Sequence, residues 1–199
     1  MSDTIGLSIF DIRHGWAKCR LTSGEKQFEF TFGYCTDAFA DLAWGALSAA
    51  VGQHAFALVM DDEPTGWFWD FRRDLDWARD GRRWEPTVLI LSLWQTPSSS
   101  ETGIRMMNGG DPRLGGNKRF EARIDESQFA QAMLSEFERI EREMGMAAFE
   151  AAWMQPYPSR AIAALRTALA TEARSQPQED TENSSSIMIR HSQSGQQDA

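Results

Sequence analysis

The sequence predicts an α+β domain over residues 4–174, in which a mostly antiparallel sheet of about six or seven strands packs with one central helix and about two or three C-terminal helices. Two observations lead to this fold class. Short runs of apolar residues alternating with polar ones are typical of half-buried strands. Longer segments with apolar residues at helical spacing are typical of amphipathic helices. A chain of 199 residues can also bury a core without metals or disulfides.

Three runs near the N-terminus suit strands, over residues 7–12, 16–21 and 28–34, and glycine-containing turns separate them. In the third run the aromatic residues share one face and the polar residues share the other. We therefore expect it to be a half-buried strand. Its aromatic face comprises Phe28, Phe30, Phe32 and Tyr34.

The period then changes to that of a helix, with apolar residues at helical spacing between Phe39 and Ala50. Thr36 or Asp37 is positioned to cap this helix, and Gly52 lies near its end. Next, residues 56–60, a turn at 63–66 and an aromatic run at 67–71 predict a hairpin. Residues 88–94 are apolar on both faces, as expected of a central strand.

Residues 96–117 are rich in Ser, Gly, Asn and Pro, and we expect the longest structureless loop of the domain there. A strand over 119–124 then leads into a helix capped by Asp125, whose apolar stripe opposes a charged face that includes Glu136 and Arg139. Gly145 breaks this helix before a short segment, and Pro156-Tyr157-Pro158 starts a last helix. The stripe comprises Phe129, Met133, Phe137, Ile140 and Met144.

From residue 175 the composition shifts to Gln, Ser, Glu and Asp, which cannot offset the entropy of ordering. We expect residues 175–199 to be a disordered polar tail. The N-terminus lacks the basic start and apolar run of a signal peptide, and no apolar stretch is long enough to span a membrane. The expected location is therefore the cytoplasm, without membrane contact.

The formal net charge of −9 argues against a general nucleic-acid binder, because phosphate contacts supply most of that affinity. Arginines and tryptophans do interleave over residues 69–84, as in platforms for single-stranded nucleic acid, but acidic residues among them neutralise the charge. We predict no nucleic-acid partner. An acidic chain suits a protein partner with a basic surface instead.

Three groups of residues are candidates for chemical sites. Cys19 and Cys35 fall in predicted strands and are expected to be buried free thiols. Asp11, His14 and Cys19 could form a catalytic triad, but such triads are rarely local in sequence, so we interpret them as a turn histidine and a core thiol. Residues 61–63, Asp-Asp-Glu, could bind a cation, but consecutive strand residues point to opposite faces, which favours an exposed hairpin shoulder. We therefore predict no catalytic residue, cofactor or metal ion, and we lean against an enzyme.

The aromatic run at residues 67–71 is the most informative feature of the chain, which has 8 Trp and 12 Phe in all. Its rings occupy both faces of the predicted strand, so one face closes a core and the other must be covered by another layer, a partner or a ligand. We predict that Trp67, Trp69 and Arg73 form an accessible binding surface, with Phe68 inside. The alternative is that Trp67 and Trp69 fill a second core layer under the terminal helices.

Residues 32–42, FGYCTDAFADL, followed by residues 60–69, MDDEPTGWFW, resemble small uncharacterised bacterial α+β proteins. In those proteins a strand, a T/S-D-A helix start, a helix and a D/E-E-P-G-x-W hairpin recur, and the resemblance covers residues 5–75. It implies no activity, because the shared motif is a helix cap and a hairpin turn. By size and acidity alone the chain is also similar to immunity and antitoxin partners of bacterial toxins.

The sequence thus predicts a non-enzymatic acidic protein-binding module, of which an immunity- or antitoxin-type inhibitor of a cytoplasmic partner is one form. The alternative is an enzyme or small-ligand-binding domain with a pocket between the aromatic sheet face and loop 96–117.

Overall fold

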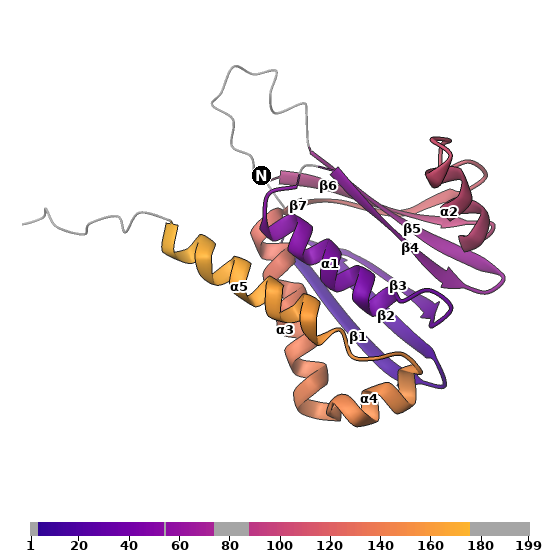
Figure 1. Cartoon of the computed structure of the whole chain (residues 1–199). Helices are drawn as coiled ribbons and strands as arrows, with labels where there is room; N and C mark the ends of the chain where they lie inside the picture. The colour runs from indigo at the N-terminus through magenta and orange to yellow at the C-terminus, as the bar shows by residue number, and fades with distance from the viewer. Residues whose placement is uncertain (1–3, 54, 74–87, 176–199) are drawn as a thin grey trace, which may run out of the picture.

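The computed structural model describes residues 4–53, 55–73 and 88–175, which form a seven-stranded sheet and five helices (Figure 1). The strands lie in the sheet in chain order, and every pair of neighbours is antiparallel. The predicted α+β class is therefore confirmed. The strands are β1 (Ile5–Arg13), β2 (Trp16–Ser23), β3 (Lys26–Gly33), β4 (Ala55–Asp62), β5 (Thr65–Arg73), β6 (Val88–Thr96) and β7 (Asn117–Asp125). The helices are α1 (Ala38–Ala50), α2 (Ser99–Met107), α3 (Glu126–Met144), α4 (Met146–Trp153) and α5 (Ser159–Ser175).

Two sequence predictions fall on residues outside these ranges. The predicted disordered tail lies outside them except for Ser175, the last residue of α5. Residues 74–84 of the arginine- and tryptophan-rich segment also lie outside them. None of the helices in the described ranges combines the length and the apolar character that crossing a membrane requires.

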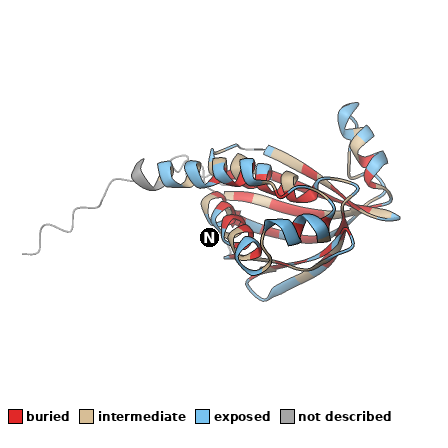
Figure 2. Ribbon diagram, turned by 60° about the horizontal axis from the view of Figure 1, so that its bottom comes forward, coloured by how far each residue is buried: buried red, intermediate tan, exposed pale blue. Residues whose placement is uncertain are grey.

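One face of the sheet is covered by α1, α3 and α4, while α5 packs on α1 and α3, and the core lies between the sheet and these helices (Figures 1 and 2). Asp37 caps α1, and its side chain accepts a hydrogen bond from the Ala40 amide. Asp125 caps α3 as predicted, accepting from the amides of Ser127 and Gln128. The predicted stripe of α3 is buried from Phe129 to Ile140. Capping and apolar spacing therefore placed the main helices correctly.

Residues 96–117 contain a helix, so the expectation of a structureless loop is wrong. The Ser98 hydroxyl caps α2 by accepting from the Glu101 amide at 3.3 Å. This Ser-x-x-Glu spacing is a helix-start signal that the Ser- and Gly-rich composition concealed. Helix α2 packs on β4 and β5, on the face opposite the other helices. The contact is close, because a Cβ added at Gly66 would meet the Ser99 backbone at 2.7 Å.

The sheet is weakly joined between β3 and β4, where the ladder has a single pair, Gly33 with Asp61. Side chains strengthen this junction. The Trp67 indole Nε1–H donates to the Thr31 carbonyl at 2.8 Å and to Asp62 Oδ2 at 3.0 Å. One indole therefore bonds to both halves of the sheet.

The charged face of α3, which includes Glu136 and Arg139, is not wholly exposed to solvent. Glu136 is buried, and its carboxylate accepts a hydrogen bond from the Ile9 amide of the edge strand β1. Arg139 donates to the Ile9 carbonyl at 2.6 Å. These two side chains satisfy backbone groups that an edge strand would otherwise leave open. The helix thereby protects the sheet edge.

Candidate functional site at the junction of β3 and β4

The predicted binding surface is not accessible in the structure. Trp67 is 4% exposed and Trp69 is 0% exposed, so the expectation that these rings face a partner is wrong. The Trp67 ring packs against Phe30 at a centroid distance of 5.0 Å, and the Trp69 ring lies 5.7 Å from the same residue. Arg73 is half-buried near Glu126. Tryptophan burial is favoured here because Phe28 and Phe30 of β3 supply apolar area on this face of β5.

Phe68 is 2% exposed, so the ring expected to lie inside and the two tryptophan rings expected outside are all buried. It shares the face of Gly66, on which α2 packs. The second aromatic face is therefore covered at this point by the chain's own helix.

The residues of the candidate triad, Asp11, His14 and Cys19, are engaged elsewhere in the fold. Asp11 pairs with Arg13 at 3.0 Å and with Lys18 at 2.9 Å, and the bond from Lys18 is the main cause that lowers the pKa of Asp11. The Cys19 thiol is free and buried, as predicted, and burial raises its pKa. His14 lies in the turn between β1 and β2 with a φ of 52°. Their interpretation as turn and core residues agrees with these contacts.

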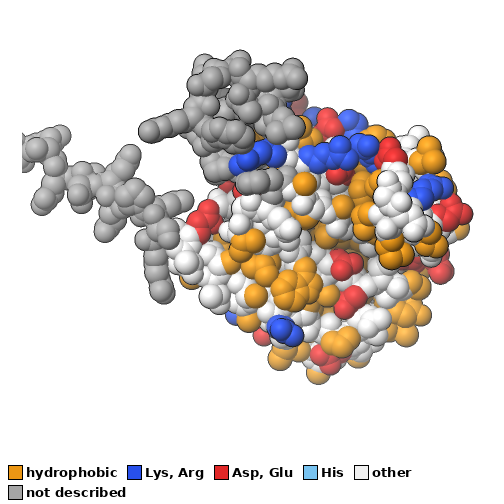
Figure 3. All heavy atoms as spheres, turned by 45° about the horizontal axis from the view of Figure 1, so that its top comes forward, with side chains coloured by type: hydrophobic (Ala, Val, Ile, Leu, Met, Phe, Trp, Pro, Cys, Tyr) orange, Lys and Arg blue, Asp and Glu red, His pale blue; other side chains and the backbone are white. Residues whose placement is uncertain are grey.

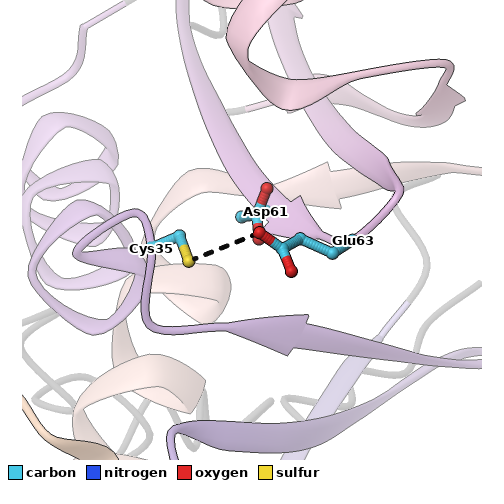
Figure 4. A group of neighbouring side chains, drawn as sticks. All are labelled: Cys35, Asp61 and Glu63. Carbon is cyan, nitrogen blue, oxygen red and sulfur yellow. Dashed lines mark hydrogen bonds between the residues drawn. The ribbon is translucent and has the colours of Figure 1, made fainter.

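The structure instead brings together Cys35, Asp61 and Glu63 (Figure 4). Cys35 lies in the turn between β3 and α1 and is exposed, so its predicted burial in a strand is wrong. Asp61 is near the end of β4, and Glu63 is in the tight turn before β5. The thiol sulfur and one oxygen of each carboxylate lie within 4.8 Å of one another.

Asp61 is the buried member of this group. Its backbone amide donates to Thr36 Oγ1 at 3.1 Å, and its Oδ1 accepts from the Ser99 hydroxyl at 2.6 Å. Its Oδ2 is shielded from solvent and has no hydrogen-bond partner. Buried carboxylate oxygens are normally satisfied, so the open oxygen requires an explanation.

Acidic groups collect around this junction without cations. Five carboxylates from the α1 start, β4 and the β4–β5 turn have no Lys or Arg partner at ion-pair distance among the described residues, whereas most other acidic clusters of the fold do. Burial and the neighbouring Asp37 raise the pKa of Asp41 to about 6. The five are Asp37, Asp41, Asp61, Asp62 and Glu63.

The outer face of α1 continues this acidic surface. Trp44 is 45% exposed and stands one turn after Asp41, and α1 contains no Lys or Arg. A large exposed ring beside uncompensated carboxylates is an uncommon surface for a folded domain. Asp37, Asp41 and Trp44 are called the α1 acidic face below.

The cluster of Cys35, Asp61 and Glu63 is not arranged for nucleophilic catalysis. Partial desolvation by the surrounding protein, followed by the charges of Asp61 and Glu63, raises the pKa of the Cys35 thiol. A raised pKa leaves little thiolate, which is the reactive form. The three groups do offer one sulfur and two oxygen donors in a small volume.

Comparison with known proteins gives no family or relative from which a role for these residues could be inferred. No family model, curated protein or solved structure matches the chain. The resemblance over residues 5–75, and the similarity to immunity proteins by class, stay predictions.

Sequence reasoning missed both parts of this region for different reasons. Trp44 lies off the apolar stripe of α1, which was a readable sign of exposure. Cys35 and Asp61 are 26 positions apart, and no spacing rule connects them. Their proximity depends on the single pair that joins β3 to β4.

Proposed function

We propose that this chain is a non-enzymatic, acidic protein-binding module that recognises a partner with a basic surface through the α1 acidic face. An immunity- or antitoxin-type inhibitor is one form of such a module. The observation that carries the proposal is the exposed Trp44 ring on the same helix face as Asp41. Tryptophan is enriched in binding hot spots, and surrounding charges steer encounter and set specificity.

The charge distribution supports a basic partner. The chain has a formal net charge of −9, and the carboxylates of the α1 acidic face have no intramolecular cation among the described residues. On the face that Figure 3 shows, basic side chains gather along the upper part, while acidic ones in the middle lie among hydrophobic and neutral groups. A partner with Lys or Arg opposite Asp37 and Asp41 relieves their mutual repulsion. Binding through this face is therefore expected to weaken as salt rises.

The test uses the full chain as bait in a lysate of its source cells, followed by affinity measurements with the purified captured protein. Trp44→Ala removes the ring, and we expect a loss of affinity of about 30-fold or more, as for a hot-spot residue. Asp37→Asn keeps a good helix cap but removes the charge, so we expect slower association at low salt and little change in dissociation.

Trp16→Ala is the matched control, because Trp16 is also exposed, at 36%, but lies on β2 outside the α1 acidic face. Its affinity should equal that of the unmodified chain. Equal binding by Trp44→Ala, or a captured protein without salt-dependent binding, contradicts the proposal.

The alternative of a ligand pocket between the aromatic sheet face and residues 96–117 gains no support from this packing. The aromatic rings of β5 are buried, and Ser99 of α2 closes directly on Gly66. The α1 acidic face therefore carries the functional proposal.

A further inference from the structure

We propose that Cys35, Asp61 and Glu63 bind one divalent transition-metal ion of the zinc class across the junction of β3 and β4. The inference is independent of the protein-binding proposal, since it uses none of the residues of the α1 acidic face. It rests on three observations: the donor geometry, the open oxygen of Asp61, and the place of the three residues in the fold.

The donors lie close to the separations that a metal ion requires. The three ligand atoms are within 4.8 Å of one another. Tetrahedral zinc, with Zn–S near 2.3 Å and Zn–O near 2.0 Å, places its ligand atoms about 3.3–3.5 Å apart. The Cys35 sulfur already lies 3.9 Å from Glu63 Oε1, and rotation of the exposed Cys35 and Glu63 side chains can bring the ligand atoms closer together. The cluster thus needs a side-chain adjustment and no change of fold.

Asp61 supplies the observation that distinguishes this cluster from an ordinary acidic patch. Only 7% of the residue is exposed, and its Oδ2 has no hydrogen-bond partner. Its other oxygen is fixed by the Ser99 hydroxyl at 2.6 Å, which orients the carboxylate. An oriented outer contact of this kind is typical of metal ligands. A cation at Oδ2 would satisfy the one oxygen of Asp61 that the fold leaves open.

Of the three consecutive acidic residues, Asp61 and Glu63 belong to the cluster and Asp62 does not. Asp62 points away from the cluster, because its oxygens accept from Thr31 Oγ1 at 2.5 Å and Trp67 Nε1 at 3.0 Å. Asp61 and Glu63 are two positions apart and contribute to the same group. The third donor, Cys35, comes from a distant turn that the fold places beside them (Figure 4).

The donor set favours a borderline-soft ion. A thiolate is a poor ligand for Mg²⁺ or Ca²⁺, whereas Zn²⁺ and Co²⁺ accept sulfur together with carboxylate oxygen. Three protein donors leave a fourth position for water or for a ligand. Cysteine ligates as the thiolate, so binding must release the proton of the Cys35 thiol. Affinity is therefore expected to rise with pH.

The experiment titrates the reduced full chain with Co²⁺ and then displaces it with Zn²⁺. We expect one equivalent of Co²⁺ to give a thiolate-to-cobalt charge-transfer band, and Zn²⁺ to abolish it. Cys35→Ser should remove the band, and Glu63→Gln should weaken Co²⁺ binding by more than about tenfold. Both residues are exposed, so both variants are expected to fold.

Glu25→Gln is the matched control, since it removes one exposed carboxylate in the β2–β3 turn and should leave the titration unchanged. Zn²⁺ should also slow the reaction of Cys35 with a thiol reagent. The reagent reports on Cys35 because the other cysteine, Cys19, is buried. No saturable Co²⁺ binding, or binding without a thiolate band, overturns the proposal. A band that survives Cys35→Ser, or full affinity in Glu63→Gln, overturns it equally.

Discussion

Trp67 is expected to stabilise the junction of β3 and β4 through its indole N–H, and Trp67→Phe tests this. The substitution keeps an aromatic ring beside Phe28 and Phe30. It removes a donor that bonds the Thr31 carbonyl at 2.8 Å and the Asp62 carboxylate at 3.0 Å. Because β3 and β4 form only one ladder pair, the indole donor supplies a large share of the hydrogen bonds that join the two strands.

Trp69→Phe is a matched control for the magnitude. The two rings are almost equally buried, at 4% and 0% exposure, but the Trp69 Nε1 has no hydrogen-bond partner. Both variants lose a similar ring volume, so the difference between them isolates the donor. Leaving part-buried acceptors unpaired costs about 1–3 kcal/mol, and the cost is at the upper end when an acceptor is charged. We expect Trp67→Phe to be the less stable variant by that amount.

The assay is urea denaturation followed by far-UV circular dichroism, which avoids the fluorescence change that losing a tryptophan causes. Equal urea m-values for both variants would show that the comparison reports stability alone. If Trp69→Phe were as destabilising as Trp67→Phe, the indole bond would contribute nothing measurable, and the reasoning about the junction would be wrong.

Two further predictions concern packing and titration. Gly66→Ala should destabilise the fold by about 1–3 kcal/mol, because its Cβ would meet the Ser99 backbone at 2.7 Å. Gly103→Ala inside α2, where a Cβ would meet nothing within 4 Å, should stabilise the fold by up to about 1 kcal/mol. Thermal unfolding of both variants measures these changes, and an unchanged stability of Gly66→Ala contradicts the first. Burial raises the pKa of Glu126 from 4.5 to about 7, so the folded chain holds this proton more tightly and the group's contribution to stability is lost as pH rises through that window. Glu126→Gln should flatten the pH dependence of the urea midpoint between pH 4.5 and 7, and an unchanged profile counts against the assignment.

The elements of this fold could be predicted locally because their signals are local. Alternation in β3 and β5, the Asp37 and Asp125 caps, and the break at Gly145 all act within a few residues, and the structure has each of them. Helix α2 has the same kind of local signal in Ser98 and Glu101. The Ser- and Gly-rich composition around it favours a loop, and the capping pattern is the signal that predicts the helix.

The sequence by itself determined the strands and the helices other than α2, and that both faces of β5 would be covered. Only the tertiary structure decided what covers them, because apolar periodicity shows that a face is buried and does not name its neighbour. It buried Trp67 and Trp69, set Glu136 against the edge of β1, and exposed Trp44. The meeting of Cys35 with Asp61 likewise depends on how β4 returns beside β3 after α1, a long-range pairing that no local pattern specifies.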